Sequence, residues 1–430
     1  MAEDADRTVE VEGLARVEGE GSLKVEVRAG RVSDVRLSIF EPPRYFEAML
    51  VGRRHSEAPD ITARICGICP VAYQMSACAA VEAAVGVEPG PRVTALRRLL
   101  YCGEWIQSHA LHVYLLHAPD FFGYADAVEL ADHDRAAVER GLGLKRTGNL
   151  VMETVGGRAV HPVNVRVGGF WTAPERSAIA ALADPLRRAR DAALATVEWV
   201  AGFDIPEVVG DYRFVALSQA PSYPLEGGRV VSSDGLDLDP AEFCDLVVEE
   251  HVARSTALQA RLGGAYLTGP LARYSLNGRL LPPAAREAAD AAGLGSVCRN
   301  PFQSIVVRAV ELVFACDEAL RLVQTYEPPE PAAADVPGRA GVGVGVTEAP
   351  RGLLLHRYRL DDDGLIRAAR IMPPTSQNQL TIEEDLRRVV EANLDADDAR
   401  LGWLCEQAVR NHDPCISCAA HFLDMAVDRS

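Results

Sequence analysis

This 430-residue chain is poor in basic residues and in long apolar runs, and both features limit its possible partners. Basic residues are scarce: 44 lysines and arginines stand against 61 aspartates and glutamates, which leaves a formal net charge of −17. That charge argues against nucleic acid and against an anionic membrane surface as binding partners. Apolar runs of the roughly 20 residues that cross a bilayer are also missing. The first residues are polar and acidic, unlike a signal peptide, so we expect a cytoplasmic protein without a membrane span.

The chain also lacks two patterns that carry electrons. Cysteines other than the four discussed next are isolated, and none of them has an iron–sulfur spacing, so we expect no such cluster here. The stretch from Gly341 to Val346 alternates glycine and valine but lacks the Gly-x-Gly-x-x-Gly spacing of a dinucleotide site. We therefore expect a glycine-spaced strand there, and no nicotinamide nucleotide bound to this chain.

Two Cys-x-x-Cys pairs stand at opposite ends of the chain. Cys66 and Cys69 come early, and Cys415 and Cys418 come almost at the end. A Cys-x-x-Cys turn directs two sulfur atoms to one point, so the two pairs can supply four thiolates to one metal centre. The polypeptide between them would then be the scaffold that brings both pairs together.

Three kinds of site are compatible with paired cysteines. A tetrahedral zinc site is the commonest, although structural zinc usually holds small domains whose pairs lie about 12–20 residues apart. A chain of this length buries its own core and does not need such a site. A thioredoxin-like redox pair would require no distant second pair. Spacing alone leaves zinc and a catalytic transition metal both open.

The residues around the cysteines carry a family resemblance. Arg64-Ile-Cys-Gly-Ile-Cys-Pro70 and Asp413-Pro-Cys-Ile-Ser-Cys-Ala-Ala-His421 resemble the two signature sequences of nickel–iron hydrogenase large subunits, in the family's order. The resemblance runs from end to end, and it points to the cytoplasmic, bidirectional, NAD(P)-linked branch. It implies the catalytic subunit of a [NiFe] hydrogenase, which cleaves H2 reversibly and heterolytically into protons and electrons.

The same resemblance assigns the four thiolates. It implies that Cys66 and Cys415 bind nickel terminally. Cys69 and Cys418 would bridge nickel to an iron that carries carbon monoxide and cyanide. Soft thiolates suit soft transition metals and exclude magnesium or calcium from the same pocket.

Further residues fall on family positions around this centre. The resemblance implies that the thiolate of Cys415 accepts a proton and passes it to Glu18. It places Arg351 over the iron, in contact with a cyanide, with Pro350 beside it, and it makes Arg351 and Asp413 a polar canopy. Without the resemblance, Glu18 would be interpreted as the solvated edge of a hairpin, and the Pro-Arg-Gly segment as a simple turn.

A hard divalent ion, usually magnesium, also belongs to the family. The resemblance implies Glu47 and His421 as its ligands, together with a backbone carbonyl near Arg370. On sequence alone, Glu47 would be interpreted as surface charge. Two other positions depart from the family pattern, because Ser108 stands where many members have aspartate and Tyr73 where they have histidine. We expect a different environment for protons and gas there.

Partners follow from the missing cluster ligands and from the resemblance. Electrons would leave through an iron–sulfur small subunit, and the bidirectional branch adds diaphorase subunits that bind flavin and NAD(P). Nickel-insertion factors are implied, with a maturation endopeptidase that cuts after His421 and removes residues 422–430. One alternative is a non-catalytic scaffold subunit of the respiratory complex I type, although such subunits lack the four cysteines. A structural zinc protein is the other.

We expect one α+β unit, mainly helical, in which a long-helix bundle is joined by small N-terminal and peripheral sheets. Residues 1–60 would form a β-rich part and residues 61–326 the helical core. A proline-rich connector, residues 327–337, would lead into residues 338–421, which close the metal site.

Local patterns also predict single helices. Apolar spacing predicts one long amphipathic helix over residues 91–117. A capping box at Asp239 predicts a helix that runs to about Ala253, and a second capping box predicts that another helix begins at Thr381.

Overall fold

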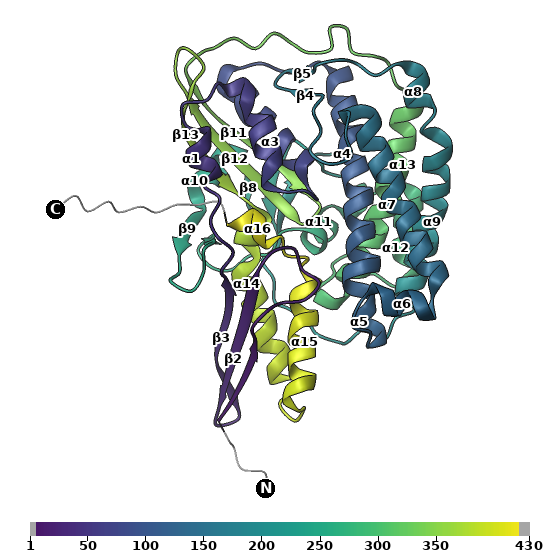
Figure 1. The fold of residues 1–430 in the computed structure, drawn as a ribbon, viewed down its shortest axis with the longest axis vertical. Coiled ribbons are helices and arrows are strands. Elements are labelled where there is room, and N and C mark those ends of the chain that lie inside the picture. The colour runs from purple at the N-terminus through teal and green to yellow at the C-terminus, as the bar shows by residue number, and fades with distance from the viewer. Residues whose placement is uncertain (1–5, 421–430) are drawn as a thin grey trace, which may run out of the picture.

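The computed structural model (Figure 1) describes residues 6–420 as a bundle of long helices beside several small antiparallel sheets. The bundle stands on the right of Figure 1 and the sheets on the left. The expected α+β, mainly helical class is confirmed. His421 and residues 422–430 lie outside the described residues. Within residues 6–420, no helix is long and apolar enough to cross a membrane.

The elements have the following bounds. The strands are β1 Arg7–Val11, β2 Gly21–Arg28, β3 Arg31–Ile39, β4 Val165–Arg166, β5 Gly169–Phe170, β6 Val215–Ser218, β7 Arg229–Ser232, β8 Asp237–Leu238, β9 Val248–His251, β10 Leu258–Arg261, β11 Gly341–Ala349, β12 Gly352–Leu360 and β13 Ile366–Met372. The α-helices are α1 Phe46–Leu50, α2 Ala58–Thr62, α3 Pro70–Val85, α4 Pro91–Leu111, α5 Ala118–Phe122, α6 Ala127–His133, α7 Arg135–Gly156, α8 Arg176–Ala180, α9 Ala183–Ala201, α10 Pro240–Leu246, α11 Pro270–Asn277, α12 Pro283–Ala291, α13 Ser304–Gln324, α14 Pro374–Glu391, α15 Asp398–Asn411 and α16 Ile416–Ala419. The shorter helical turns are η1 His55–Glu57, η2 Ala63–Ile65, η3 His112–His117, η4 Gly278–Leu280 and η5 Pro301–Gln303.

The bundle is built on α4, which packs against α7 and α13, while α13 packs in turn against α9. The single helix expected over residues 91–117 is interrupted, because α4 ends at Leu111 and continues as the wider π-helical turn η3. Pro119 follows closely, and it cannot donate the backbone hydrogen bond that a continuing α-helix would need. One core of apolar side chains runs through the bundle and reaches the four paired cysteines.

The glycine–valine alternation of β11 is explained by the packing of this strand on α3. An added Cβ at Gly341, Gly343 or Gly345 would lie 2.0–2.4 Å from a backbone oxygen of α3. Only glycine permits so close an approach of strand to helix. The expected strand is confirmed, and it pairs along its whole length with β12. The turn between β11 and β12 contains Pro350 and Arg351.

The N-terminal sheet, in the order β1-β2-β3, packs on α14 and α15. Alternate residues of β2, among them Leu23, Val25 and Val27, are buried in this contact. The loop between β1 and β2 extends toward α16 and carries Glu18. The sheet therefore anchors a loop that reaches the site.

Two of the expected helix boundaries are wrong. The capping box at Asp239 is present, but α10 ends at Leu246, because the next residues pair with β10 as the strand β9. The second helix, α14, begins at Pro374 and not at Thr381. Thr381 lies inside it and donates its hydroxyl to the carbonyl of Tyr266 at 2.8 Å. Tertiary pairing decided both boundaries.

Candidate metal centre

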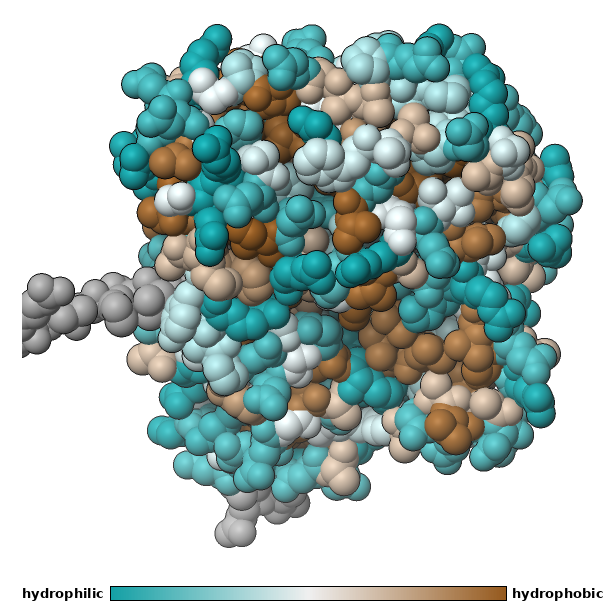
Figure 2. Space-filling view, turned by 45° about the horizontal axis from the view of Figure 1, so that its top comes forward, coloured by the Kyte–Doolittle hydropathy of each residue, from teal (hydrophilic) through white to brown (hydrophobic). Residues whose placement is uncertain are grey.

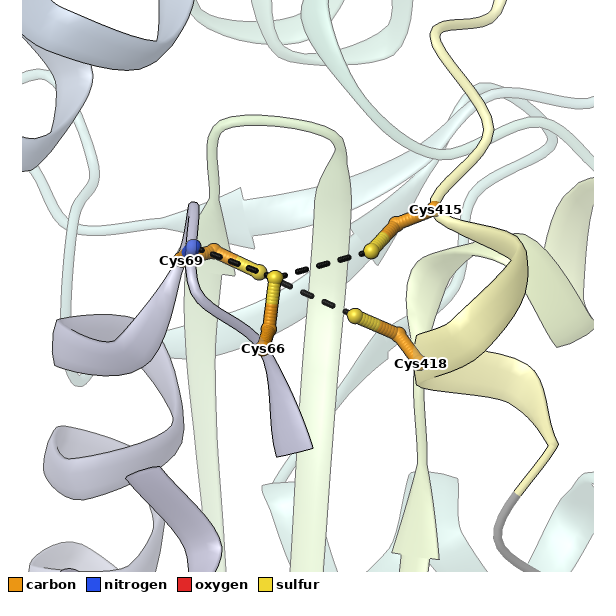
Figure 3. Close-up of side chains that lie close together, drawn as sticks. All are labelled: Cys66, Cys69, Cys415 and Cys418. Atoms are coloured by element: carbon orange, nitrogen blue, oxygen red, sulfur yellow. Dashed lines mark hydrogen bonds between the residues drawn. The ribbon is translucent and has the colours of Figure 1, made fainter. Parts of the chain in front are cut away.

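The two cysteine pairs meet in the interior of the molecule, as expected from the sequence. Their four sulfur atoms all lie within 4.8 Å of one another. The Sγ atoms of Cys66 and Cys415 are 3.6 Å apart, and those of Cys69 and Cys418 are 4.0 Å apart. Figure 3 shows the side chains of each pair pointing toward those of the other. No side chain of the four is more than 4% exposed.

Helix α4 holds the first pair in place. Two backbone amides, those of Ile68 and Cys69, donate to the Sγ of Cys66 at 3.3 Å. Gln107 donates to the carbonyl of Ile68 at 2.5 Å. Glu104, fully buried, accepts two backbone N–H groups from the first turn of α3, at 2.6 and 3.1 Å. The turn containing the cysteines is thus fixed by two side chains of one rigid helix.

The second pair is held by a strained turn and by α14. Asp413 has a φ of 51°, in the left-handed region that a residue with a side chain rarely adopts. The backbone N–H of Cys415 donates to the hydroxyl of Thr375 in α14 at 2.9 Å. Cys418 follows in the short helix α16.

Arg44 ties the two cysteine segments together. Its guanidinium donates to the carbonyl of Ile65 at 2.8 Å and to the carbonyl of Ser417. Its backbone N–H donates to the carbonyl of Ala420 at 2.9 Å. Sequence reasoning missed Arg44, which no motif marks. It also missed Glu104, where a carboxylate inside an apolar helix was a signal.

Glu18 lies against the second pair. The Sγ of Cys415 is 3.0 Å from Oε2 of Glu18, and the backbone N–H of Ser417 donates to the same oxygen at 3.1 Å. Gly19 permits this approach, because its φ is 90° and an added Cβ would lie 2.8 Å from the Ser417 nitrogen. Glu18 as a residue is half-buried, whereas Cys415 is buried.

Arg351 and Asp413 form a buried ion pair beside the sulfur atoms. Nε of Arg351 donates to the Asp413 carbonyl at 2.9 Å, and Nη2 donates to Oδ1 at 3.0 Å. Nη1 of Arg351, Oδ2 of Asp413 and the Ser108 hydroxyl are buried without a hydrogen-bond partner. Buried polar atoms of this kind are rare in folded proteins and mark space for a bound group or water.

The thiols themselves favour a cation. Hydrogen bonds from the other thiols, that of Cys415 above all, hold the pKa of Cys66 well below its usual range. Burial raises the pKa of Cys415 and that of Cys418 well above theirs. Because burial disfavours the charged form, four thiolates in this pocket require a bound metal ion to offset their negative charge. A tetrahedral ion with sulfur bonds of about 2.3 Å separates its ligands by roughly 3.8 Å, so the pocket also fits zinc.

Glu47, in α1, lies beside β13. Its Oε1 accepts the backbone N–H of Ile371 at 2.6 Å. Burial raises the pKa of Glu47 to about 7. The guanidinium of the neighbouring Arg370 is engaged elsewhere: its Nε donates to Glu249 at 2.7 Å. His421, the third residue expected at this site, lies outside the described residues.

Comparison with known proteins decides which metal centre is meant. Residues 44–142 match the family model described as nickel-dependent hydrogenase. Sulfhydrogenase 1 subunit alpha of Pyrococcus furiosus is 34% identical over 418 residues, which cover 96% of this chain and 97% of that protein. This chain belongs to the nickel-dependent hydrogenase family. Sulfhydrogenase 2 subunit alpha of the same organism is 31% identical, over 97% of this chain and 100% of that protein.

Solved hydrogenase structures agree with this family assignment. An NAD+-reducing [NiFe]-hydrogenase in the H2-reduced state matches with a TM-score of 0.86 and 28% identity, over 96% of this chain and 99% of that one. The [NiFeSe]-hydrogenase of Dm. baculatum, at 22% identity and a TM-score of 0.81, shares the fold. The chain is thus a [NiFe] hydrogenase large subunit, an oxidoreductase acting on H2. The zinc and scaffold alternatives are set aside.

Proposed function

We propose that the four-cysteine pocket holds a nickel–iron centre, with carbon monoxide and cyanide on the iron, at which H2 is cleaved reversibly and heterolytically. The observation that carries the proposal is a buried set of four thiols with a carboxylate, that of Glu18, 3.0 Å from one of them. When bound, the centre supplies a Lewis acid that polarises H2. The protein supplies the base and the dry, polar surroundings.

The pairing of the sulfur atoms supports a division of labour among the cysteines. Cys66 and Cys415, which face each other at 3.6 Å, are the proposed terminal ligands of nickel. Cys69 and Cys418, which face each other at 4.0 Å, are the proposed bridges between nickel and iron. Each Cys-x-x-Cys turn would thus contribute one terminal and one bridging thiolate.

The proton leaves, in this proposal, through Cys415 and Glu18. The Cys415 sulfur takes the proton and donates it across 3.0 Å to the Glu18 carboxylate. The amide of Ser417 holds the accepting oxygen in place, so little reorganisation is needed. Because Glu18 is half-buried, it can pass the proton outward.

Arg351, Pro350 and Asp413 form the proposed canopy over the iron. Two hydrogen bonds to Asp413 fix the Arg351 guanidinium, and its Nη1 remains without a partner. A free N–H donor of a cation suits an anionic ligand such as cyanide. Pro350, just before Arg351, restricts the turn.

A magnesium ion bound by Glu47, His421 and a backbone carbonyl near Arg370 is the second proposed metal. The buried Glu47 carboxylate supports it, because burial favours the neutral form unless a cation lies close.

Residues 338–421 would close the centre as one part of a single unit, since they carry Arg351 and the second cysteine pair. An endopeptidase and nickel-insertion factors would act before closure.

We further propose that electrons pass to an iron–sulfur small subunit and then through a flavin-containing diaphorase to NAD(P), in the cytoplasm. Hydrophobic residues gather in patches on the face in Figure 2. Patches of this kind mark protein interfaces. The similar NAD+-reducing hydrogenase supports NAD(P) as acceptor.

Metal analysis with infrared spectroscopy of the purified complex tests the proposal. We expect one nickel and one iron per chain and bands from bound carbon monoxide and cyanide. Stoichiometric zinc without such bands would overturn it. For the electron path, the complex should reduce NAD+ or NADP+ under H2, and failure with both nucleotides, while H2 oxidation with a dye persists, would overturn that part alone.

A further inference from the structure

A wholly buried arginine lies behind the canopy. Arg273 in α11 is 0% exposed. Its Nε and Nη2 donate to the two carboxylate oxygens of Glu311, both at 2.8 Å. Nη1 donates to Glu348 at 3.0 Å and to the carbonyl of Ala349 at 2.8 Å, and Nη2 donates to the carbonyl of Pro350 at 2.9 Å. All five N–H groups of the guanidinium are thus used.

Two of these five bonds end on the carbonyls that directly precede Arg351. We propose that Arg273 is a positioning residue for Arg351: it fixes the backbone turn from which the Arg351 side chain reaches Asp413 and the sulfur pocket. The inference rests on the proposed function, and it adds a residue that does not touch the metal centre.

The residues just before helix α11 also contact the Arg351 turn, from its other side. The residue before the helix, Gly269, has a φ of 110°, and an added Cβ would lie 2.6 Å from the carbonyl oxygen of Arg351. The hydroxyl of Thr268 accepts the backbone N–H of Leu353 at 2.8 Å. The Arg351 turn is therefore held between the start of α11 and the side chain of Arg273.

The charges around Arg273 make its guanidinium group hard to replace by another cationic group. Burial would raise the pKa of Glu311, but Arg273 holds it at about 2. Burial lowers the pKa of His109, whose Nε2 lies 3.0 Å from Glu311, to about 4, so this ring is neutral at pH 7. Trp105 lies under the guanidinium, with 4.4 Å from Cζ to the ring centre. A lysine would keep the charge but supplies three donors instead of five.

A second buried arginine offers a matched control. Arg97 in α4 is 4% exposed and donates to both carboxylate oxygens of Glu82, at 2.6 and 3.0 Å. Its remaining partner is the carbonyl of Arg166, away from the canopy turn. Arg97→Lys therefore perturbs a similar buried pair without loosening the Arg351 backbone.

A double-mutant cycle separates positioning from general stability. The variants are Arg273→Lys, Arg351→Lys and their combination, each in the metal-loaded complex, with H2/D2 exchange per bound nickel as readout. We expect Arg273→Lys alone to slow exchange ten- to hundred-fold, as small misplacements of catalytic groups do. In the Arg351→Lys background, the added Arg273→Lys substitution should slow exchange less than about threefold. If Arg273→Lys slows exchange by the same factor in both backgrounds, the proposal is overturned. For the control Arg97→Lys, any effect on exchange should be the same in both backgrounds.

Backbone amide exchange in the metal-free protein gives a readout that does not depend on activity. Amides of Ala349, Arg351, Gly352 and Leu353 should exchange at least about tenfold faster in Arg273→Lys, with Arg97→Lys leaving them unchanged. Unchanged protection of the turn in Arg273→Lys would also overturn the proposal. If wild-type protein binds zinc alone, the proposed function fails while this measurement still decides the positioning. Thr268→Val, which loosens the same turn from its other side, carries the same expectation if Arg273→Lys does not fold.

Discussion

The sulfur of Cys415 lies 3.0 Å from a carboxylate oxygen of Glu18, although 397 positions separate the two residues. The contact is part of a backbone attachment, because the N–H of Ile416 donates to the Glu18 carbonyl at 2.8 Å. A proposed base is thus carried by the same local structure as the thiol that it serves. This backbone hydrogen bond helps to hold the carboxylate close to the thiol.

Glu18→Gln should block proton exit while the metal centre still assembles. An amide cannot accept and release a proton at neutral pH, so H2/D2 exchange should fall about 100-fold or more with normal nickel and iron content. Glu41→Gln is the matched control, since Glu41 accepts the Ser417 hydroxyl at 2.7 Å in the same loop contact. Exchange close to wild type in Glu18→Gln would show that protons leave by another route.

Magnesium should stabilise the metal-free protein in a pH-dependent way through Glu47. Its pKa rises from an ordinary 4.5 to about 7 on burial, so the folded state binds more protons than the unfolded state between these values. The contribution of Glu47 to stability without magnesium therefore falls as pH rises through that window. Magnesium should raise the Tm more at pH 8 than at pH 6. A shift of equal size at both pH values, or one retained in Glu47→Gln, contradicts this prediction.

The contact between β11 and α3 can be tested with a pair of glycine variants. Gly345→Ala places a Cβ 2.4 Å from the Ser76 carbonyl oxygen, so strand or helix must move, at a cost of about 1–3 kcal/mol in unfolding free energy. Gly143→Ala in α7 meets nothing within 4 Å and should be neutral or stabilising by up to about 1 kcal/mol. Chemical denaturation measures both. A tolerated Gly345→Ala would mean that the two elements separate easily.

Intact-mass measurement tests the processing of the chain end. The resemblance places a cut after His421, so active enzyme should lack residues 422–430 and nickel-starved protein should retain them. The physical reason is that a tail attached just after Cys418 can hold the second cysteine pair open for metal loading. Active enzyme that still ends at Ser430 would refute this prediction.

Sequence alone identified the parts whose signal is local. The cysteine pairs and the glycine-spaced strand are each defined by residues a few positions apart, whereas Arg351 was assigned only through the family resemblance of its segment. Such patterns are legible because turn geometry and strand periodicity depend on neighbouring residues. The α+β class followed from the same kind of evidence, summed along the chain.

Tertiary structure alone decided what depends on contacts between distant segments. Arg44, Glu104 and Arg273 sit in no motif, and each matters because of the backbone groups that packing brings to it. The boundaries of α10 and α14 moved for the same reason, since strand pairing and a buried hydroxyl contact outweighed local capping signals. A hydrogen bond between residues far apart in the chain depends on every element folded between them, and local spacing contains no record of that packing.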